Sequence, residues 1–162
     1  MQNSLERFDY LTLMKNILIA LLLLLTLSAC QKEQSSHGNN PADISGFLDL
    51  TTYRPTAVEY DLTQHGNGLL GTKDYYLQAI LYYDDATFDA FKKACSTLPK
   101  SSPPVTADYD PFDFSWMSKN IKAERSKATT NNMYPGTVLT TSNPNCSILL
   151  LNNKALVHYI TM

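Results

Sequence analysis

Hydrophobic and polar positions divide the chain into an apolar head, a polar stretch and a mixed body. The head contains a run of Ile, Leu and Ala over residues 17–27 that is broken by a single Thr. Residues 31–45 then contain only two apolar side chains, Ala42 and Ile44. From residue 47 onward, apolar positions recur with the periods of strands and helices. We therefore expect one small globular domain over 47–162, preceded by a leader and a polar connecting segment.

The clearest predicted strand covers residues 74–83, where side chains alternate between two faces. Both faces are rich in aromatic and branched side chains, which suits a central strand of a sheet. One face carries Tyr75, Leu77, Ala79, Leu81 and Tyr83, and the other carries Tyr76, Gln78, Ile80 and Tyr82. Shorter alternating runs predict further strands over 57–62, 137–141, 146–151 and 155–161, the last two joined by a turn at Asn152-Asn153.

The period of the apolar positions changes after Asp84, which we expect to cap a helix. The apolar residues of this helix recur at the spacing of one helical face: Phe88, Phe91, Cys95 and Leu98. Pro99 ends the helix, and 100–111, which contains three prolines, predicts a long irregular loop. Residues 118–127 predict a second, short polar helix. Together these elements predict an α+β fold: a two-layer domain with a mostly antiparallel sheet packed against one main helix.

The apolar head has the features of a secretory signal peptide over residues 14–29. Lys15 precedes the apolar run, and small residues follow it. A membrane-spanning helix would need about 20 apolar residues, and the polar residues from Gln31 onward arrive too soon for that. Residues 1–13 contain Glu6 and Asp9, which do not suit the positively charged start of a signal peptide. We therefore predict that translation starts at Met14 and that 1–13 is a gene-model extension.

The end of the apolar run, Leu27-Ser28-Ala29-Cys30, resembles the lipobox of bacterial lipoproteins. The resemblance implies cleavage before Cys30, attachment of lipid to its sulfur and acylation of the new amino group. Several acyl chains, at about 0.8 kcal/mol per buried CH₂, would make a permanent anchor. Gln31 after the cysteine implies, for a Gram-negative member of this class, transit to the outer membrane with the body facing the periplasm. Residues 30–46 would then be the lipidated cysteine and a disordered tether.

Charge and cysteine content narrow the classes of function. The 162 residues carry a formal net charge of −2, which excludes a strongly basic nucleic-acid surface. Three cysteines exclude a dense disulfide scaffold. With Cys30 carrying lipid, Cys95 and Cys146 remain as an even pair in an oxidising compartment, so we expect them to form a disulfide worth about 4 kcal/mol. The alternative is two buried, unpaired thiols.

Two motifs suggest cofactor or metal chemistry but lack the context that it needs. Gly66-Asn67-Gly68-Leu69-Leu70-Gly71 matches a dinucleotide-binding pattern, yet a predicted strand follows where a helix should receive the pyrophosphate. The aspartates Asp108, Asp110 and Asp113 lack the glycine and glutamate of a calcium-binding loop. We therefore expect no cofactor and no metal ion.

The remaining candidates are aromatic residues and one histidine near two long loops. Tyr109, Phe112 and Trp116 border the proline-rich loop, and His65 begins the glycine-rich connection. Rigid, amphipathic rings are favoured where proteins bind one another. We therefore predict a membrane-anchored, non-enzymatic module that binds a protein or an envelope component, for example as an inhibitor, immunity-type protein or assembly factor.

An enzymatic role is the alternative reading of the same region. A small envelope hydrolase or metal-dependent enzyme would use His65 with Asp61, or the pair Asp108 and Asp110. No nucleophile or oxyanion site is evident around either pair, so the binding module is the preferred hypothesis.

Overall fold

The computed structural model describes residues 15, 34–66, 72–99, 110–129, 132–140 and 145–161. The chain divides into two compact units, 1–32 and 33–162, and only Lys15 of the first unit is described. The predicted extension, signal peptide and lipidated Cys30 therefore lie outside the described residues. Within the described part of the chain, no helix is long and apolar enough to span a membrane.

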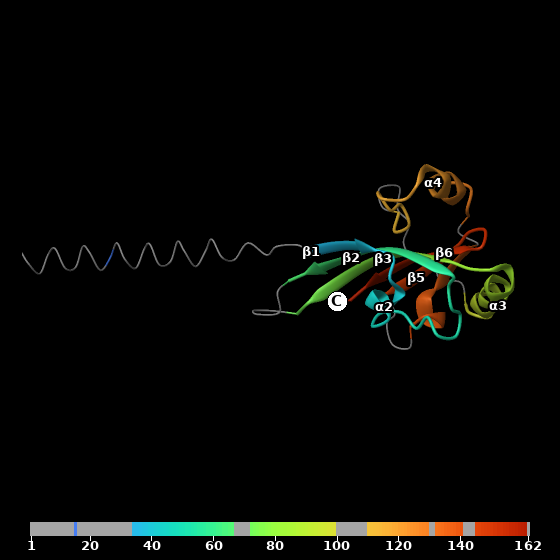
Figure 1. The fold of residues 1–162 in the computed structure, drawn as a ribbon, viewed down its shortest axis with the longest axis horizontal. Helices are drawn as coiled ribbons and strands as arrows, with labels where there is room; N and C mark the ends of the chain where they lie inside the picture. The colour runs from blue at the N-terminus through green and yellow to red at the C-terminus, as the bar shows by residue number, and fades with distance from the viewer. Residues whose placement is uncertain are drawn as a thin grey trace, which may run out of the picture. The chain divides into compact units, whose positions relative to one another are not determined.

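The second unit is built on one six-stranded antiparallel sheet (Figure 1). Its strands are β1 (Gln34–Gly38), β2 (Ala57–His65), β3 (Asp74–Tyr82), β4 (Met133–Pro135), β5 (Cys146–Leu150) and β6 (Lys154–Ile160). Their order across the sheet is β1-β2-β3-β6-β5-β4, and each neighbouring pair is antiparallel. The predicted α+β class with a mostly antiparallel sheet is confirmed.

Helices lie on both sides of this sheet (Figure 1). Figure 1 shows α2 (Pro41–Ile44) and α3 (Asp85–Ser96) on one side and α4 (Lys119–Arg125) on the other. The core on the α3 side includes Leu77, Ala79, Leu81, Phe88, Phe91, Cys95 and Val157. The core on the α4 side includes Ile80, Phe112, Phe114, Met117, Ile121, Leu149 and Leu156. The sequence predicted one layer of packing, with a main helix on one face of the sheet. The structure has a buried core on each face.

The strand and helix with the strongest periodicity form as the sequence predicts. Leu77 and Ile80 of β3 are fully buried on opposite faces, as expected for a central strand. At the start of α3, the Asp84 carboxylate accepts a hydrogen bond of 2.8 Å from the Thr87 amide. This cap satisfies one of the free N–H groups of the first turn. The Asn152-Asn153 turn is also confirmed, with Asn153 at a φ of 52°.

The predicted disordered tether is wrong from residue 34 onward, because β1 and α2 lie in it. The exposed side chains of β1 contribute no core, but its backbone pairs with the edge of β2. Gly38 stands opposite Tyr60 in this pair, and the absence of a side chain lets the Tyr60 ring lie across β1. The Tyr60 hydroxyl donates a hydrogen bond of 2.6 Å to Asp43 in α2, and Ile44 at the end of that helix is fully buried.

We expect Gly38→Val to detach β1 from the sheet. A Cβ at this position would lie 2.6 Å from the Tyr60 ring, and overpacking of this kind costs about 1–3 kcal/mol. Hydrogen exchange of the β1 amides, with urea denaturation of the same protein, measures the effect. Gly46→Val is the matched control, because nothing lies within 4 Å of a Cβ there. Equal β1 protection in both variants would contradict this role for Gly38.

The strand predicted over 137–141 is wrong for its described part. Residues Gly136–Val138 form a 3-10 helix, η2, and the chain bonds to itself there, with the Thr140 amide 3.0 Å from the Gly136 carbonyl oxygen. A Cβ on Gly136 would collide with the Cys146 side chain and lie 2.9 Å from the Cys146 carbonyl carbon. At Gly136, η2 therefore packs closely against β5, which only a residue without a side chain allows, and the strand expected over 137–141 does not form in its described part.

The predicted disulfide is absent from the structure, in which Cys95 and Cys146 are free and buried. The sulfur of Cys146 packs against Gly136 of η2, whereas Cys95 lies among the buried residues of α3. Burial raises the pKa of each thiol to about 12, which keeps both protonated and unreactive at neutral pH. The structure therefore matches the alternative of two buried, unpaired thiols.

Candidate functional site

A row of polar side chains crosses five strands on the α4 side of the sheet. The strand register places His37 opposite Asp61, Asp61 opposite Gln78, Gln78 opposite His158, and His158 opposite Ser147. Residues directly opposite each other in an antiparallel pair point to the same face. This row lies beside the apolar core under α4, and its exposure rises from the buried His158 to the exposed His37.

Trp116 joins this row from the segment that precedes α4. Its indole N–H donates a hydrogen bond of 3.1 Å to the Gln78 side-chain oxygen, and the Gln78 amide donates one of 2.9 Å to the Tyr76 hydroxyl. The indole stacks on Phe114, with ring centres 5.5 Å apart, and meets the His37 ring edge-on at 5.1 Å. A partly exposed tryptophan is therefore held by groups from β1, β3 and its own segment.

We call this surface the polar face. It comprises polar side chains on the α4 side of β1, β2, β3, β5 and β6, with Trp116 at its edge: Ser35, His37, Asp61, Thr63, His65, Asp74, Tyr76, Gln78, Ser147 and His158.

His158 is the most deeply buried titratable group of the polar face, with 6% of its surface exposed. Its ring lies edge-on to Tyr76, at 5.0 Å between centres, and to Phe112 at 6.5 Å. Burial lowers its pKa to about 4, so the ring is neutral at neutral pH. Its electrostatic role at that pH is therefore that of a neutral hydrogen-bonding ring.

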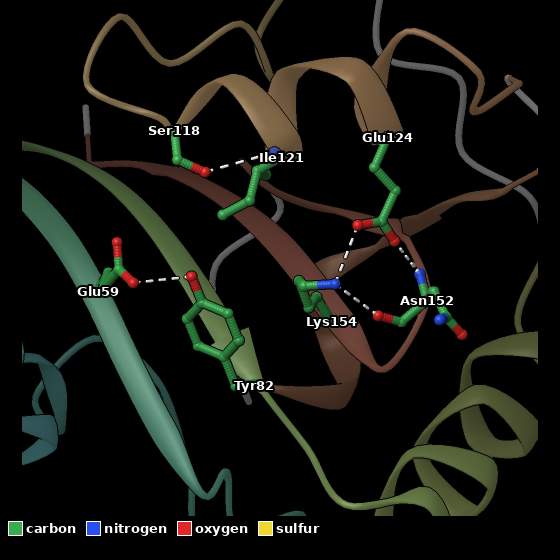
Figure 2. A network of polar contacts seen from close by, with 7 residues as sticks. All are labelled: Glu59, Tyr82, Ser118, Ile121, Glu124, Asn152 and Lys154. Carbon is green, nitrogen blue, oxygen red and sulfur yellow. Dashed lines mark hydrogen bonds and ion pairs between the residues drawn. The ribbon is translucent and has the colours of Figure 1, made fainter.

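A second polar network fastens α4 to the sheet (Figure 2). The Lys154 ammonium donates hydrogen bonds of 2.9 Å to both Glu124 and the Asn152 carbonyl oxygen. The Asn152 amide donates one of 2.6 Å to the other oxygen of Glu124. In the same view, the Tyr82 hydroxyl donates to Glu59 at 2.7 Å. Glu124 thus joins α4 to the β5–β6 turn, which positions the segment that carries Trp116.

The segment before α4 has its own attachment. Arg125 forms an ion pair with Asp110, and the Phe112 amide donates a hydrogen bond of 3.0 Å to the same carboxylate group. Ser118 caps α4 by accepting from the Ile121 amide, and Ile121 is buried. These contacts attach the described part of the segment before α4 to α4 itself.

The predicted binding residues differ in how far the structure exposes them. Phe112 is fully buried, so its prediction as an exposed binding residue is wrong. The reason is that Phe112 packs in the core with Ile80 and Leu156. Trp116 is half-buried and lies on the polar face, whereas Tyr109 lies outside the described residues.

His65 lies exposed at the end of β2 and opposite Asp74, on the same face as Asp61. Four residues along a strand separate His65 from Asp61 by about 13 Å, too far for a hydrogen bond. Asp61 instead accepts a hydrogen bond of 2.6 Å from Ser35. The proposed pairing of His65 with Asp61 is therefore not formed.

The other aspartates are not brought into a site. Asp110 is held by Arg125, and Asp108 lies outside the described residues. Across the ranges that the structure describes, no three His, Cys, Asp or Glu side chains come together in a way that would hold a metal ion.

An open groove of about 740 Å³ lies on the opposite side of the sheet, beside α2 and η2. Its walls include Leu48, Leu139 and Tyr159, which belong to the buried core. The carboxylate of Asp49 in this groove accepts hydrogen bonds from the amide and hydroxyl of Thr51, at 2.9 and 2.5 Å. These bonds lower the pKa of Asp49 and use its carboxylate within its own turn. The polar face has the more varied set of partly exposed polar groups.

Sequence reasoning missed His37, Tyr76, Gln78 and His158 as members of one surface. The alternation within 74–83 placed Tyr76 and Gln78 on one face, which was the available signal. Comparison with protein-family models, with curated proteins and with solved structures finds no match.

Proposed function

We propose that this chain is a lipid-anchored lipoprotein of the bacterial cell envelope whose folded body binds a protein partner and is not an enzyme. The anchor is Cys30 of the Leu27-Ser28-Ala29-Cys30 motif. In a Gram-negative cell the protein sits in the outer membrane and faces the periplasm. The binding surface is the polar face, and roles as an inhibitor, an immunity-type protein or an assembly factor fit such a module.

The observation that carries the binding proposal is the position of Trp116 on the polar face. A half-buried tryptophan, held in one orientation by Gln78 and Phe114, loses little conformational freedom when it binds. Aromatic side chains are enriched at the centre of protein interfaces, and acidic and lysine side chains are depleted there. The centre of the polar face follows this pattern, with tyrosine, histidine and tryptophan around Asp61, while a second carboxylate, Asp74, lies at the end of the sheet opposite His65.

A protein partner suits this surface better than a sugar. Sugar recognition by stacking needs an aromatic ring with a free face, but Trp116 contacts Phe114 and His37 with its ring. Tyr76 is likewise engaged, with His158 against its ring and Gln78 on its hydroxyl. A broad face of fixed rings and hydrogen-bonding groups matches a flat protein surface.

Capture from envelope extract by residues 31–162, with a matched pair of variants, tests the proposal. His37→Ala/Thr63→Lys alters the polar face, and Lys92→Ala/Asp89→Lys alters the exposed side of α3 with the same net change in charge. We expect the first variant to lose captured partner at least about tenfold, which is about 1.4 kcal/mol, and the second to behave as wild type. Equal loss or equal capture by both variants would argue against the polar face as the binding surface.

A further inference from the structure

We infer that the lipid anchor holds one end of the sheet against the membrane, so that the bilayer surface itself is a partner of the folded body. This inference rests on the proposed lipidation of Cys30. The contacting surface is the end of the sheet at which β1 begins. Its described side chains include Gln34, Gln64, His65, Thr72, Lys73, Asp74 and Thr161.

The first step is the length of chain between the anchor and the sheet. Strand β1 begins at Gln34, so only residues 31–33 separate it from Cys30. Four residue steps span at most about 14 Å when fully extended. A flexible tether as far as residue 46 would instead have allowed the domain to move several times farther from the bilayer. The pairing of β1 with β2 is what shortens the connection.

The second step identifies which groups share the end of the sheet with Gln34. The register places Gln34 opposite Gln64, and Gln64 opposite Tyr75. The Thr161 amide donates a hydrogen bond of 2.9 Å to the Tyr75 carbonyl oxygen, and the Tyr75 amide donates one of 2.6 Å to the Thr161 hydroxyl. Both ends of the β2–β3 connection and the end of β6 therefore lie beside the start of β1.

The chemistry of this end suits lipid headgroups. His65, Thr72 and Lys73 are exposed, and the Lys73 ammonium can donate hydrogen bonds to phosphate oxygens. The Thr72 hydroxyl donates a hydrogen bond of 3.5 Å to Asp74 at the start of β3. A lysine close to an anionic bilayer surface is attracted to it electrostatically. The polar residues Gln34 and Thr161 at the same end suit the hydrated headgroup layer better than the hydrocarbon core.

The orientation also places the polar face close to the membrane. His37 is three residues from Gln34 along β1, which is about 10 Å. The turn at Asn152 lies at the other end of the β5–β6 hairpin, near the start of α3, and faces away from the bilayer. A partner of the polar face would consequently be a protein at the membrane surface.

Fluorescence quenching in vesicles tests this orientation with the mature, full lipoprotein. Thr72→Cys and Asn152→Cys are each labelled with a fluorophore, since burial protects Cys95 and Cys146. The protein is reconstituted into phosphatidylethanolamine–phosphatidylglycerol vesicles that contain a lipid with a nitroxide on its headgroup. We expect at least about threefold stronger quenching at residue 72 than at 152. Insertion of fifteen Gly/Ser residues between Lys32 and Glu33 should remove most of this difference.

The outcomes separate the orientation from the anchor. Equal quenching at 72 and 152 in protein that floats with the vesicles would overturn the orientation and leave the anchor intact. If the chain without the insertion floats no better than Cys30→Ser, the anchor is wrong and the orientation falls with it. An unchanged difference after the insertion would show that the short connection is not its cause.

Discussion

Phe114→Ala is expected to destabilise the folded body by about 3–5 kcal/mol, because it removes a fully buried ring from the core on the α4 side. The ring also stacks on Trp116, so its loss frees the indole from one of its supports. Urea denaturation of the wild type and the variant measures the change in the free energy of unfolding. Phe114→Leu, which keeps most of the apolar volume, is the matched control and should cost much less.

Phe114→Ala also links stability to the proposed binding surface. In conditions where the variant remains folded, we expect weaker capture of the partner than with Phe114→Leu, because Trp116 loses its fixed orientation. A loss of less than about 1 kcal/mol in the alanine variant would contradict the burial of this segment against the sheet.

Acidification is expected to reduce stability by about 3 kcal/mol through His158 alone. Burial lowers the pKa of this side chain from 6.5 to about 4 in the folded state, so between these values the unfolded chain binds more protons. Stability therefore rises with pH across this window. The contribution of neutral His158 is fully present above about pH 6.5 and is lost as the pH falls to about 4.

Urea denaturation at a series of pH values measures this loss, and His158→Gln isolates it. The variant lacks the titrating ring, so the difference between wild type and variant should change across the window from pH 6.5 to 4. The carboxylates with lowered pKa, such as the helix cap Asp84, weaken the fold mainly at lower pH and in both proteins alike. Parallel curves for the two proteins would mean that His158 is accessible and protonates freely in the folded state.

The elements that the sequence predicts well are those whose side chains carry the pattern. Strand β3 alternates apolar and aromatic residues on two faces, and α3 repeats apolar residues on one face, so both periods are visible without the fold. Strand β1 could not be found in this way, because its residues Gln34–Gly38 contain no apolar side chain. Its position depends on the free edge of β2 and on the space that Gly38 leaves for Tyr60, which only the fold reveals.

The candidate site was predictable only in part for a related reason. Trp116 was identifiable as an aromatic residue beside a long loop, but alternation along the chain did not show that Phe112 and Phe114 turn into the core. The association of His37 with His158 requires the register of four strands. The disulfide was predicted from an oxidising compartment and from the even number of cysteines that remain beside Cys30. Neither observation tells where the two side chains point in the fold.

The central claim, that this is a lipoprotein anchored through Cys30, is tested most directly by the mass of its N-terminal tryptic peptide after extraction from membranes. We predict a peptide that begins at Cys30 and ends at Lys32, with the mass of the attached acyl chains. Cys30→Ser should keep the preceding residues. A mature protein whose peptide runs across Ala29 and Cys30 with an unmodified thiol would contradict the claim.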